Sequence, residues 1–153
     1  MPKFYMLIGV PASGKSTWLK QNIRGDVAVA SSDDYIEHEA KKAGKTYNDV
    51  FADTVKAGNQ WAINTAKAAF AQGKDVVWDQ TNLTKKSRAP KLALVPEEYE
   101  KIAVFFPTPH PYIHRKRLDS RPGKKIPDHI VGGMAATMEP PSKDEGFHEI
   151  ITV

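Results

Sequence analysis

The residues best suited to chemistry lie near the amino terminus, in the stretch GVPASGKS at positions 9–16. This stretch fits the pattern G-x-x-x-x-G-K-[ST] in full. Its glycines allow tight turns, so that successive backbone N–H groups can point at phosphate oxygens, aided by the positive end of a following helix. Lys15 is then placed to reach the β- and γ-phosphates of a nucleotide, and the Ser16 hydroxyl to bind Mg²⁺. The residues expected to contact the nucleotide are Gly9, Pro11, Ala12, Ser13, Gly14, Lys15, Ser16 and Thr17.

Two adjacent aspartates, Asp33 and Asp34, follow the second apolar run of the chain. A carboxylate at this position could accept the proton of a hydroxyl group that attacks the γ-phosphate. The spacing of Asp34 and Glu37 is close to a capping box, which predicts Asp34 as the N-cap of a helix and leaves Asp33 free to face the nucleotide. Asp33 is therefore the candidate general base. The alternative is that both aspartates only stabilise the start of the helix.

A third acidic residue, Asp79, ends the apolar run DVVWD at positions 75–79. This is the Walker-B position, where a carboxylate binds Mg²⁺ directly or holds one of its water ligands. Asp79 is therefore a predicted metal ligand together with Ser16. The alternative is a buried aspartate that ties neighbouring loops together through Thr81 and Asn82.

A basic segment, RKRLDSRPGKKIP at positions 115–127, carries the remaining candidates for catalysis. Arg117 and Arg121 have the i, i+4 spacing that places two side chains on one face of a helix, and a Pro-Gly break follows them. Such a helix and loop can close over a triphosphate as a lid, where both arginines would stabilise charge on the phosphoryl group being transferred. The alternative is an ordinary solvated basic surface.

Alternating strand-like and helix-like segments indicate the elements that must position these residues. The predicted strands are 3–9, 26–30, 75–80, 101–106 and 147–153, and the predicted helices are 15–23, 48–71, 84–95 with an interruption near Pro90, 111–120, and one after Pro127. This rhythm predicts an α/β fold with three layers, of the P-loop NTPase type: a parallel sheet of about four or five strands, helices on both faces, and a helical lid. Because ligands bind at the carboxyl ends of parallel strands, we expect chemistry just after residues 8, 30, 78 and 106.

The composition limits the class of protein further. With 153 residues, of which 41% are apolar and 26% charged, the chain is expected to form one globular domain over residues 1–153. It has no cysteine, which excludes disulfides and thiol nucleophiles. The net charge of +4 would help to attract phosphate-bearing ligands, although a lysine-rich surface alone would also produce it. No signal-like amino terminus and no membrane-length apolar run is found, which predicts a cytoplasmic protein with no membrane partner.

Four stretches, GVPASGKSTW, SSDDY, DQTNL and RPGKKIP, occur in this order along the chain. With them the sequence resembles the phage-type polynucleotide 5′-hydroxyl kinases, within the small P-loop kinases. The tail EPPSKDEGFHEI is similar to the tail of the kinase domains in animal polynucleotide repair kinases. The resemblance implies that Lys15 and Ser16 hold ATP and Mg²⁺, and that Asp33 activates the 5′-hydroxyl of a DNA or RNA strand. It also implies that Arg121 and Arg117 contact the phosphates.

The chain departs from that family in the region that binds the acceptor. Ile36 occupies the position at which the phage enzymes carry an arginine that helps to hold the acceptor's phosphate. Either other basic residues bind the acceptor or the acceptor differs. The basic candidates are Lys41, Lys42, Lys85, Lys86 and Arg88.

The sequence therefore leaves three functions open. The first is ATP-dependent phosphorylation of a polynucleotide 5′-hydroxyl, and the second is phosphorylation of a nucleoside, nucleotide or sugar, which an apolar Ile36 would suit. The third is a nucleotide-dependent binding module that transfers no phosphate. Of the other side chains, Trp78 is predicted to pack in the core rather than to stack on a base. His110 and His114 are expected on an ordinary polar face.

Overall fold

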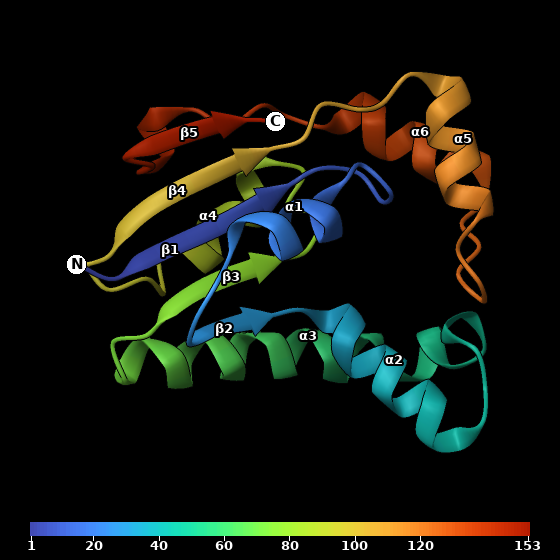
Figure 1. Ribbon diagram of the computed structural model, residues 1–153, viewed down its shortest axis with the longest axis horizontal. Helices are drawn as coiled ribbons and strands as arrows, with labels where there is room; N and C mark the ends of the chain where they lie inside the picture. Colours follow the sequence, from blue (N-terminus) through green and yellow to red (C-terminus); the bar gives the residue numbers. More distant parts are fainter.

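The computed structural model of the protein describes all residues, 1–153, as a parallel β-sheet surrounded by helices (Figure 1). Its five strands lie in the order β2-β3-β1-β4-β5, and every neighbouring pair is parallel. The strands are β1 (Lys3–Ile8), β2 (Val27–Ala30), β3 (Asp75–Asp79), β4 (Glu100–Phe105) and β5 (Glu149–Thr152). The predicted parallel sheet of four or five strands is confirmed, and the last strand of the chain forms one of its edges.

Helices cover both faces of the sheet, as the alternation of elements predicted. Successive residues of a strand point to opposite faces, so the side chains of Met6 and Leu7 in β1 belong to different parts of the core. The Leu7 face packs against α1 (Lys15–Asn22). The Met6 face packs against α3 (Tyr47–Ala71) and α4 (Lys85–Leu92), which bury the larger part of the core. The three layers place the carboxyl ends of all strands at one edge of the molecule (Figure 1).

The helix α2 (Ser32–Ala43) begins earlier than the capping pattern predicted. Its N-cap is Ser31, whose Oγ accepts a hydrogen bond from the Asp34 N–H at 3.4 Å. The prediction that Asp34 caps this helix was wrong, because Ser31 has the extended backbone that an N-cap needs and both aspartates lie in the first turn. Their negative charges there favour the positive end of the helix dipole.

The helix α4 continues through Pro90, where the sequence predicted an interruption. A reciprocal capping box between Thr84 and Ser87 fixes the start of this helix. Pro90 has no N–H to donate to the Lys86 carbonyl, but both residues are exposed, so water can take the place of the missing donor. Solvation of the Lys86 carbonyl therefore offsets part of the cost of the proline.

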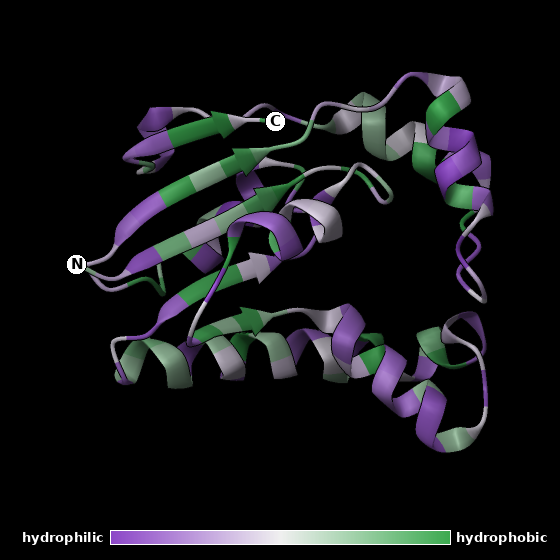
Figure 2. Ribbon diagram, viewed as in Figure 1, coloured by the Kyte–Doolittle hydropathy of each residue, from purple (hydrophilic) through white to green (hydrophobic).

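Two further helices, α5 (Pro111–Asp119) and α6 (Asp128–Thr137), lie past the carboxyl ends of the strands. A short 3₁₀ turn, η1 (Lys143–Glu145), then leads into β5. Figure 2 shows hydrophobic residues concentrated in the strands, whereas α2 and α5 carry many hydrophilic ones. This distribution fits a buried sheet and two outer helices with solvated faces. None of the helices, the 25-residue α3 included, is both long and apolar enough to cross a membrane.

Candidate active site

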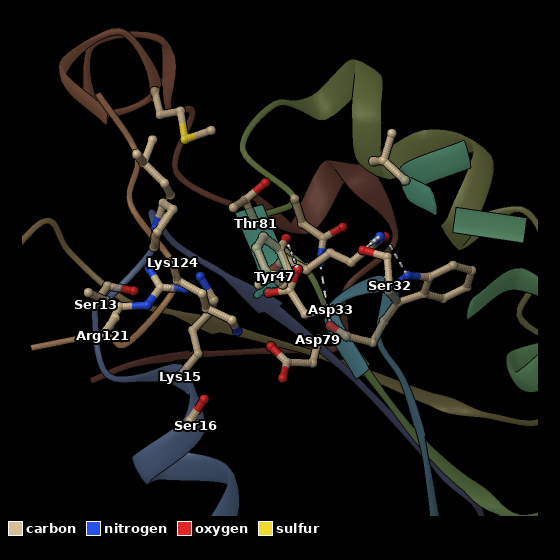
Figure 3. Close-up of a pocket in the computed structure, with 18 of the residues that line it drawn as sticks. Ser13, Lys15, Ser16, Ser32, Asp33, Tyr47, Asp79, Thr81, Arg121 and Lys124 are labelled. Atoms are coloured by element: carbon tan, nitrogen blue, oxygen red, sulfur yellow. Dashed lines mark hydrogen bonds between the residues drawn. The ribbon is translucent and has the colours of Figure 1, made fainter. Parts of the chain in front are cut away.

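A cavity of about 1430 Å³ opens at the carboxyl edge of the sheet. Its walls come from the loop before α1, the end of β3, the starts of α2 and α3, and the segment from Arg117 to Met134. Figure 3 shows side chains of these separate elements around one common space. The cavity therefore lies where parallel sheets bind their ligands, and it collects residues from the phosphate loop, both predicted acidic sites and the basic segment.

The phosphate loop (residues 9–16) uses its two glycines for different physical reasons. Gly14 has a φ of 108° and ends the loop as the N-cap of α1, a left-handed conformation that favours glycine. Gly9 instead has no space for a side chain, because a Cβ there would lie 2.7 Å from Ser13 Oγ and 2.9 Å from Phe106 Cβ. Ala12 also has a positive φ, of 59°, which is uncommon outside glycine. The loop is thus held in a strained turn by its neighbours.

Lys15 lies inside the curve of the phosphate loop. Its Nζ donates hydrogen bonds to the carbonyl oxygens of Gly9 at 2.7 Å and Val10 at 3.0 Å. Burial lowers the pKa of Lys15 to about 8, and the nearby carboxylates of Asp79 and Asp33 act in the opposite direction. The predicted phosphate-binding lysine therefore shares its surroundings with both predicted acidic residues.

Asp79 ends β3 beside the phosphate loop. Burial raises the pKa of its carboxyl group to about 6, and the charge of Lys15 opposes this shift. The alternative role of Asp79, a link to Thr81 and Asn82, is not seen, because the Asn82 amide donates to the Leu7 carbonyl at 2.8 Å instead. Figure 3 shows the Asp79 carboxylate facing Lys15.

A magnesium ion would find suitable donors in Asp79 and Ser16, whose hydroxyl is exposed. Both offer oxygen, and Mg²⁺ often takes only one or two protein ligands and completes its shell with phosphate oxygens and water. The structure contains no group of three or more acidic or histidine side chains that could hold a metal on its own. The two residues therefore fit a metal ion that binds together with a nucleotide.

Asp33 lines the same cavity from the first turn of α2. The Tyr47 hydroxyl donates a hydrogen bond of 2.6 Å to Asp33 Oδ1, a contact that the sequence analysis missed. Burial, followed by the hydrogen bond to Asp33, raises the pKa of Tyr47 far above its ordinary value. The phenol therefore keeps its proton and acts as a donor, which fixes the orientation of the carboxylate. Because 14 residues separate the two side chains, no local pattern indicated the pair.

The basic segment contributes Arg117 and Arg121 to the cavity wall. The prediction that they share a helical face was wrong in part: α5 ends at Asp119, because Arg121 precedes a proline and is disfavoured in a helix. The Arg121 Nη1 atom and the Ser13 Oγ atom are buried without hydrogen-bond partners. Unpaired buried donors are rare in folded proteins and fit a site for an anion such as a phosphate.

His114, expected on an ordinary polar face, is buried and reaches the phosphate loop. Its Nε2 lies 2.7 Å from the Pro11 carbonyl oxygen, so the ring donates to the loop and holds it in place. His110 has a different role, since its Nδ1 accepts a hydrogen bond from the Tyr112 N–H at the start of α5. His114 thus connects α5 to the phosphate loop, whereas His110 caps the start of α5.

The basic segment also contacts the start of α3. Asn48 Nδ2 donates to the Lys125 carbonyl at 2.8 Å, and the Lys125 N–H donates to Asn48 Oδ1 at 2.9 Å. Lys124 forms an ion pair with Glu37, and its Nζ lies 4.7 Å from the ring centroid of Tyr47. The segment therefore bridges the cavity, from the phosphate-loop side to the residues around Asp33.

Ile36 does not reach the cavity. Its side chain is fully buried between α2 and α3, where it packs with Ala40 and Val50. Gly58 of α3 allows this close approach, since a Cβ there would lie 3.1 Å from the Ser32 carbonyl oxygen. The apolar residue at this position therefore belongs to the core, and it gives no information on the polarity of the acceptor.

Arg88 is not available to bind an acceptor either. Its guanidinium group is fully buried, with an ion pair of 2.8 Å to Glu145 and a hydrogen bond of 2.9 Å to the Asn82 carbonyl. Such a network ties α4 to the segment before β5. Trp78 is fully buried as well, which confirms the prediction that it packs in the core. The remaining basic candidates lie on the surface and are Lys41, Lys42, Lys85 and Lys86.

Several known structures have a fold similar to that of this chain, at low sequence identity. A chain of the Pnkp1/Rnl/Hen1 RNA repair complex is similar over 89% of this chain, with 23% identity and a TM-score of 0.64. The match spans only 43% of that longer chain. A protein of Chloroflexus aurantiacus J-10-fl, provisionally named a kinase, is similar over 99% of this chain and 84% of its own, with 18% identity and a TM-score of 0.71. A gluconokinase of Sinorhizobium meliloti 1021 covers 99% of this chain and 82% of its own, with 17% identity and a TM-score of 0.56.

Sequence comparison identifies the family. No curated protein sequence matches the chain significantly. The pattern of one family, AAA_33, described as an AAA domain, matches residues 4–141. This match includes the phosphate loop, both predicted acidic sites and the basic segment, and it agrees with the five-stranded parallel sheet described above. The chain therefore belongs to the AAA_33 family of AAA domains and has the α/β fold of the P-loop kinases.

Proposed function

We propose that the protein is a kinase that transfers the γ-phosphate of ATP to the 5′-hydroxyl of a polynucleotide. One observation carries the proposal of phosphate transfer. The Asp33 carboxylate lies in the same cavity as the phosphate loop, near Lys15 and Asp79, and Tyr47 holds it in one orientation. A carboxylate oriented in this way is the group that a general base for an attacking hydroxyl requires.

In the proposed reaction the phosphate loop and Lys15 hold the triphosphate of ATP. Asp33 accepts the proton of the 5′-hydroxyl while the hydroxyl oxygen forms a bond to the γ-phosphorus. The bond from the γ-phosphorus to the bridging oxygen breaks, and ADP leaves with that oxygen. Ser16 and Asp79 would hold Mg²⁺, which offsets negative charge on the phosphate oxygens when it is bound.

The basic segment acts as the lid of this reaction, centred on residues 115–127. The buried, unpaired Arg121 Nη1 supports this role, because a phosphate oxygen is the natural acceptor for it. Arg117, in the last turn of α5, lines the same wall. Together the two arginines would stabilise the charge that spreads over the transferring phosphoryl group.

A polynucleotide is the acceptor favoured by two further features. The four stretches that resemble the polynucleotide kinases all contribute residues to the cavity wall. Exposed lysines, Lys41, Lys45 and Lys125, lie near the cavity's outer edge or in the smaller cavity beside it, where strand phosphates could be bound. The small-acceptor alternative has lost its main support, because Ile36 is buried away from the site.

Transfer of labelled γ-phosphate tests the proposal directly. The protein is incubated with ATP and Mg²⁺ and offered a 5′-hydroxyl oligonucleotide beside a panel of nucleosides, nucleotides and sugars. We expect label on the 5′ end of the oligonucleotide and a KM for that strand that rises steeply with salt. Label on a small acceptor alone would overturn the polynucleotide proposal, and ATP binding without any transfer would show a binding module.

A further inference from the structure

One face of α3 forms a long, mainly apolar wall of the active-site cavity. Phe51, Val55, Asn59 and Ile63 recur every fourth residue and all line the cavity. At 1.5 Å per residue this row is about 18 Å long. Phe51, nearest the basic segment, is 42% exposed although it is a large apolar side chain. We call this row the α3 wall.

The α3 wall begins next to the proposed base. The ring centroids of Phe51 and Tyr47 are 5.6 Å apart, and the Tyr47 hydroxyl donates to Asp33. A molecule whose hydroxyl group gives its proton to Asp33 would therefore bind in the part of the cavity that Tyr47 and Phe51 line. Whether this wall is polar or apolar therefore indicates what kind of group the acceptor carries next to its reacting hydroxyl.

The polar groups around the α3 wall mostly form hydrogen bonds with one another. The Gln80 Nε2 donates to Ser32 Oγ at 2.8 Å and to Asn59 Oδ1 at 3.1 Å, and its Oε1 accepts from Trp78 Nε1 at 2.9 Å. A site that selects a sugar or sugar acid needs free donors and acceptors for several hydroxyls, because an unpaired polar group costs affinity. This wall offers mainly apolar surface instead.

We propose that the α3 wall binds the nucleobase of the acceptor's 5′-terminal nucleotide, with Phe51 as the residue on which the base stacks. The inference rests on the polynucleotide acceptor proposed above and adds the group by which the enzyme holds the end of the strand. A nucleobase is flat and largely apolar on its faces, and stacking on an aromatic ring suits any base. Contacts of this kind would compensate for the arginine that is absent at Ile36.

Two acceptor strands test the inference with the wild-type protein. They have the same sequence and the same 5′-hydroxyl, but one has an abasic sugar as its terminal nucleotide. We expect the KM for the abasic strand to be about 5- to 150-fold higher, from the range of stacking energies per base. The Phe51→Ala variant should bind both strands equally weakly, with an unchanged KM for ATP. Phe51→Tyr, which keeps the ring, should restore the preference for the complete strand.

Trp61→Ala provides the matched control. Trp61 is also an exposed aromatic residue of α3, at 38%, but it packs against Tyr35 of α2 and does not line the cavity. This variant should keep the wild-type preference for the complete strand. Equal use of both strands by the wild type, or a preference that survives in Phe51→Ala, would overturn the inference and leave the polynucleotide kinase intact. No transfer to either strand would overturn both proposals together.

Discussion

The donor side and the acceptor side of the cavity are built in different ways. The donor side is centred on the phosphate loop, a continuous stretch whose glycines allow its turns, with Phe106 and His114 in contact with it. The acceptor side is assembled from side chains far apart in sequence, such as Asp33 with Tyr47 and Asn48 with Lys125. The turn of the phosphate loop is therefore encoded largely within one short stretch. The orientation of the proposed base depends instead on the packing of α2, α3 and the basic segment.

Asp33→Asn should have the largest effect, because it removes the proposed base and leaves the donor side untouched. The asparagine amide cannot accept the proton of the acceptor hydroxyl, so kcat should fall by about 10²- to 10⁴-fold while the affinity for ATP stays the same. Steady-state transfer assays and nucleotide titrations measure the two quantities separately. An unchanged kcat would show that Asp33 is structural, and a loss of ATP binding would place it on the donor side.

Arg121→Ala should have the next largest effect, since Arg121 is a proposed phosphate ligand and its unpaired Nη1 lies in the cavity wall. Loss of one donor to the transferring group should lower kcat by about 10²- to 10³-fold. Arg121→Lys should recover only part of this rate, because lysine lacks the planar fork of donors. Arg117→Ala should cost less, as the exposed Arg117 is more strongly solvated. An equal loss in both alanine variants would contradict the special position assigned to the buried Arg121 nitrogen.

Tyr47→Phe should reduce kcat by roughly tenfold, with unchanged KM values for ATP. The variant loses the hydrogen bond of 2.6 Å that orients Asp33, and a bond to a charged group contributes about 1.5–3 kcal/mol. Tyr112→Phe is the control, because Tyr112 is 72% exposed and outside the cavity. Should the rates of both variants equal the wild-type rate, the acceptor side would not depend on Tyr47 for its orientation.

Asp79→Asn, a substitution on the donor side, should change how the free energy of unfolding depends on pH. Burial raises the pKa of Asp79 to about 6 from its ordinary 3.8, so between these values the folded protein binds a proton that the unfolded chain has released. The stability of the wild type therefore falls as the pH rises from about 4 to about 6, and the loss is complete above pH 6. The asparagine variant lacks this titration and should be more stable above pH 6, by up to about 3 kcal/mol.

Urea unfolding of both proteins at several pH values, without nucleotide or Mg²⁺, measures this difference. The stability curves should converge near pH 4 and separate toward pH 6. Added Mg²⁺ and nucleotide should reduce the gap, because a bound cation favours the charged carboxylate of the wild type. Parallel curves across the whole range would contradict the assigned pKa.

Sequence reasoning worked best where neighbouring residues decide the outcome. The apolar runs predicted all five strands, and their alternation with helices predicted the layers of the fold. The loop pattern located Gly14 and Lys15 correctly at the start of α1. Even the positions of Asp33 and Asp79 at the edge of the sheet followed from the ends of the strands that precede them.

Contacts between segments far apart in the chain were not predicted from the sequence. The local cap of α2 was missed as well, because the capping pattern suggested Asp34 whereas Ser31 accepts the hydrogen bond from the Asp34 N–H. The sequence placed Arg88 among the residues that could bind an acceptor, but it is buried with an ion pair to Glu145 and hydrogen bonds to backbone carbonyls. His114 gave no signal of its contact with Pro11, which depends on where α5 lies after β4.

The sequence by itself thus determined the fold class and the donor side, because strand periodicity and the phosphate loop are encoded within short stretches. Only the tertiary structure decided which polar side chains are free and which are paired. It removed Ile36 and Arg88 from the acceptor site, and it brought Tyr47 to Asp33 and Phe51 to the cavity wall. The physical reason is that burial and pairing depend on residues that meet only when the chain has folded.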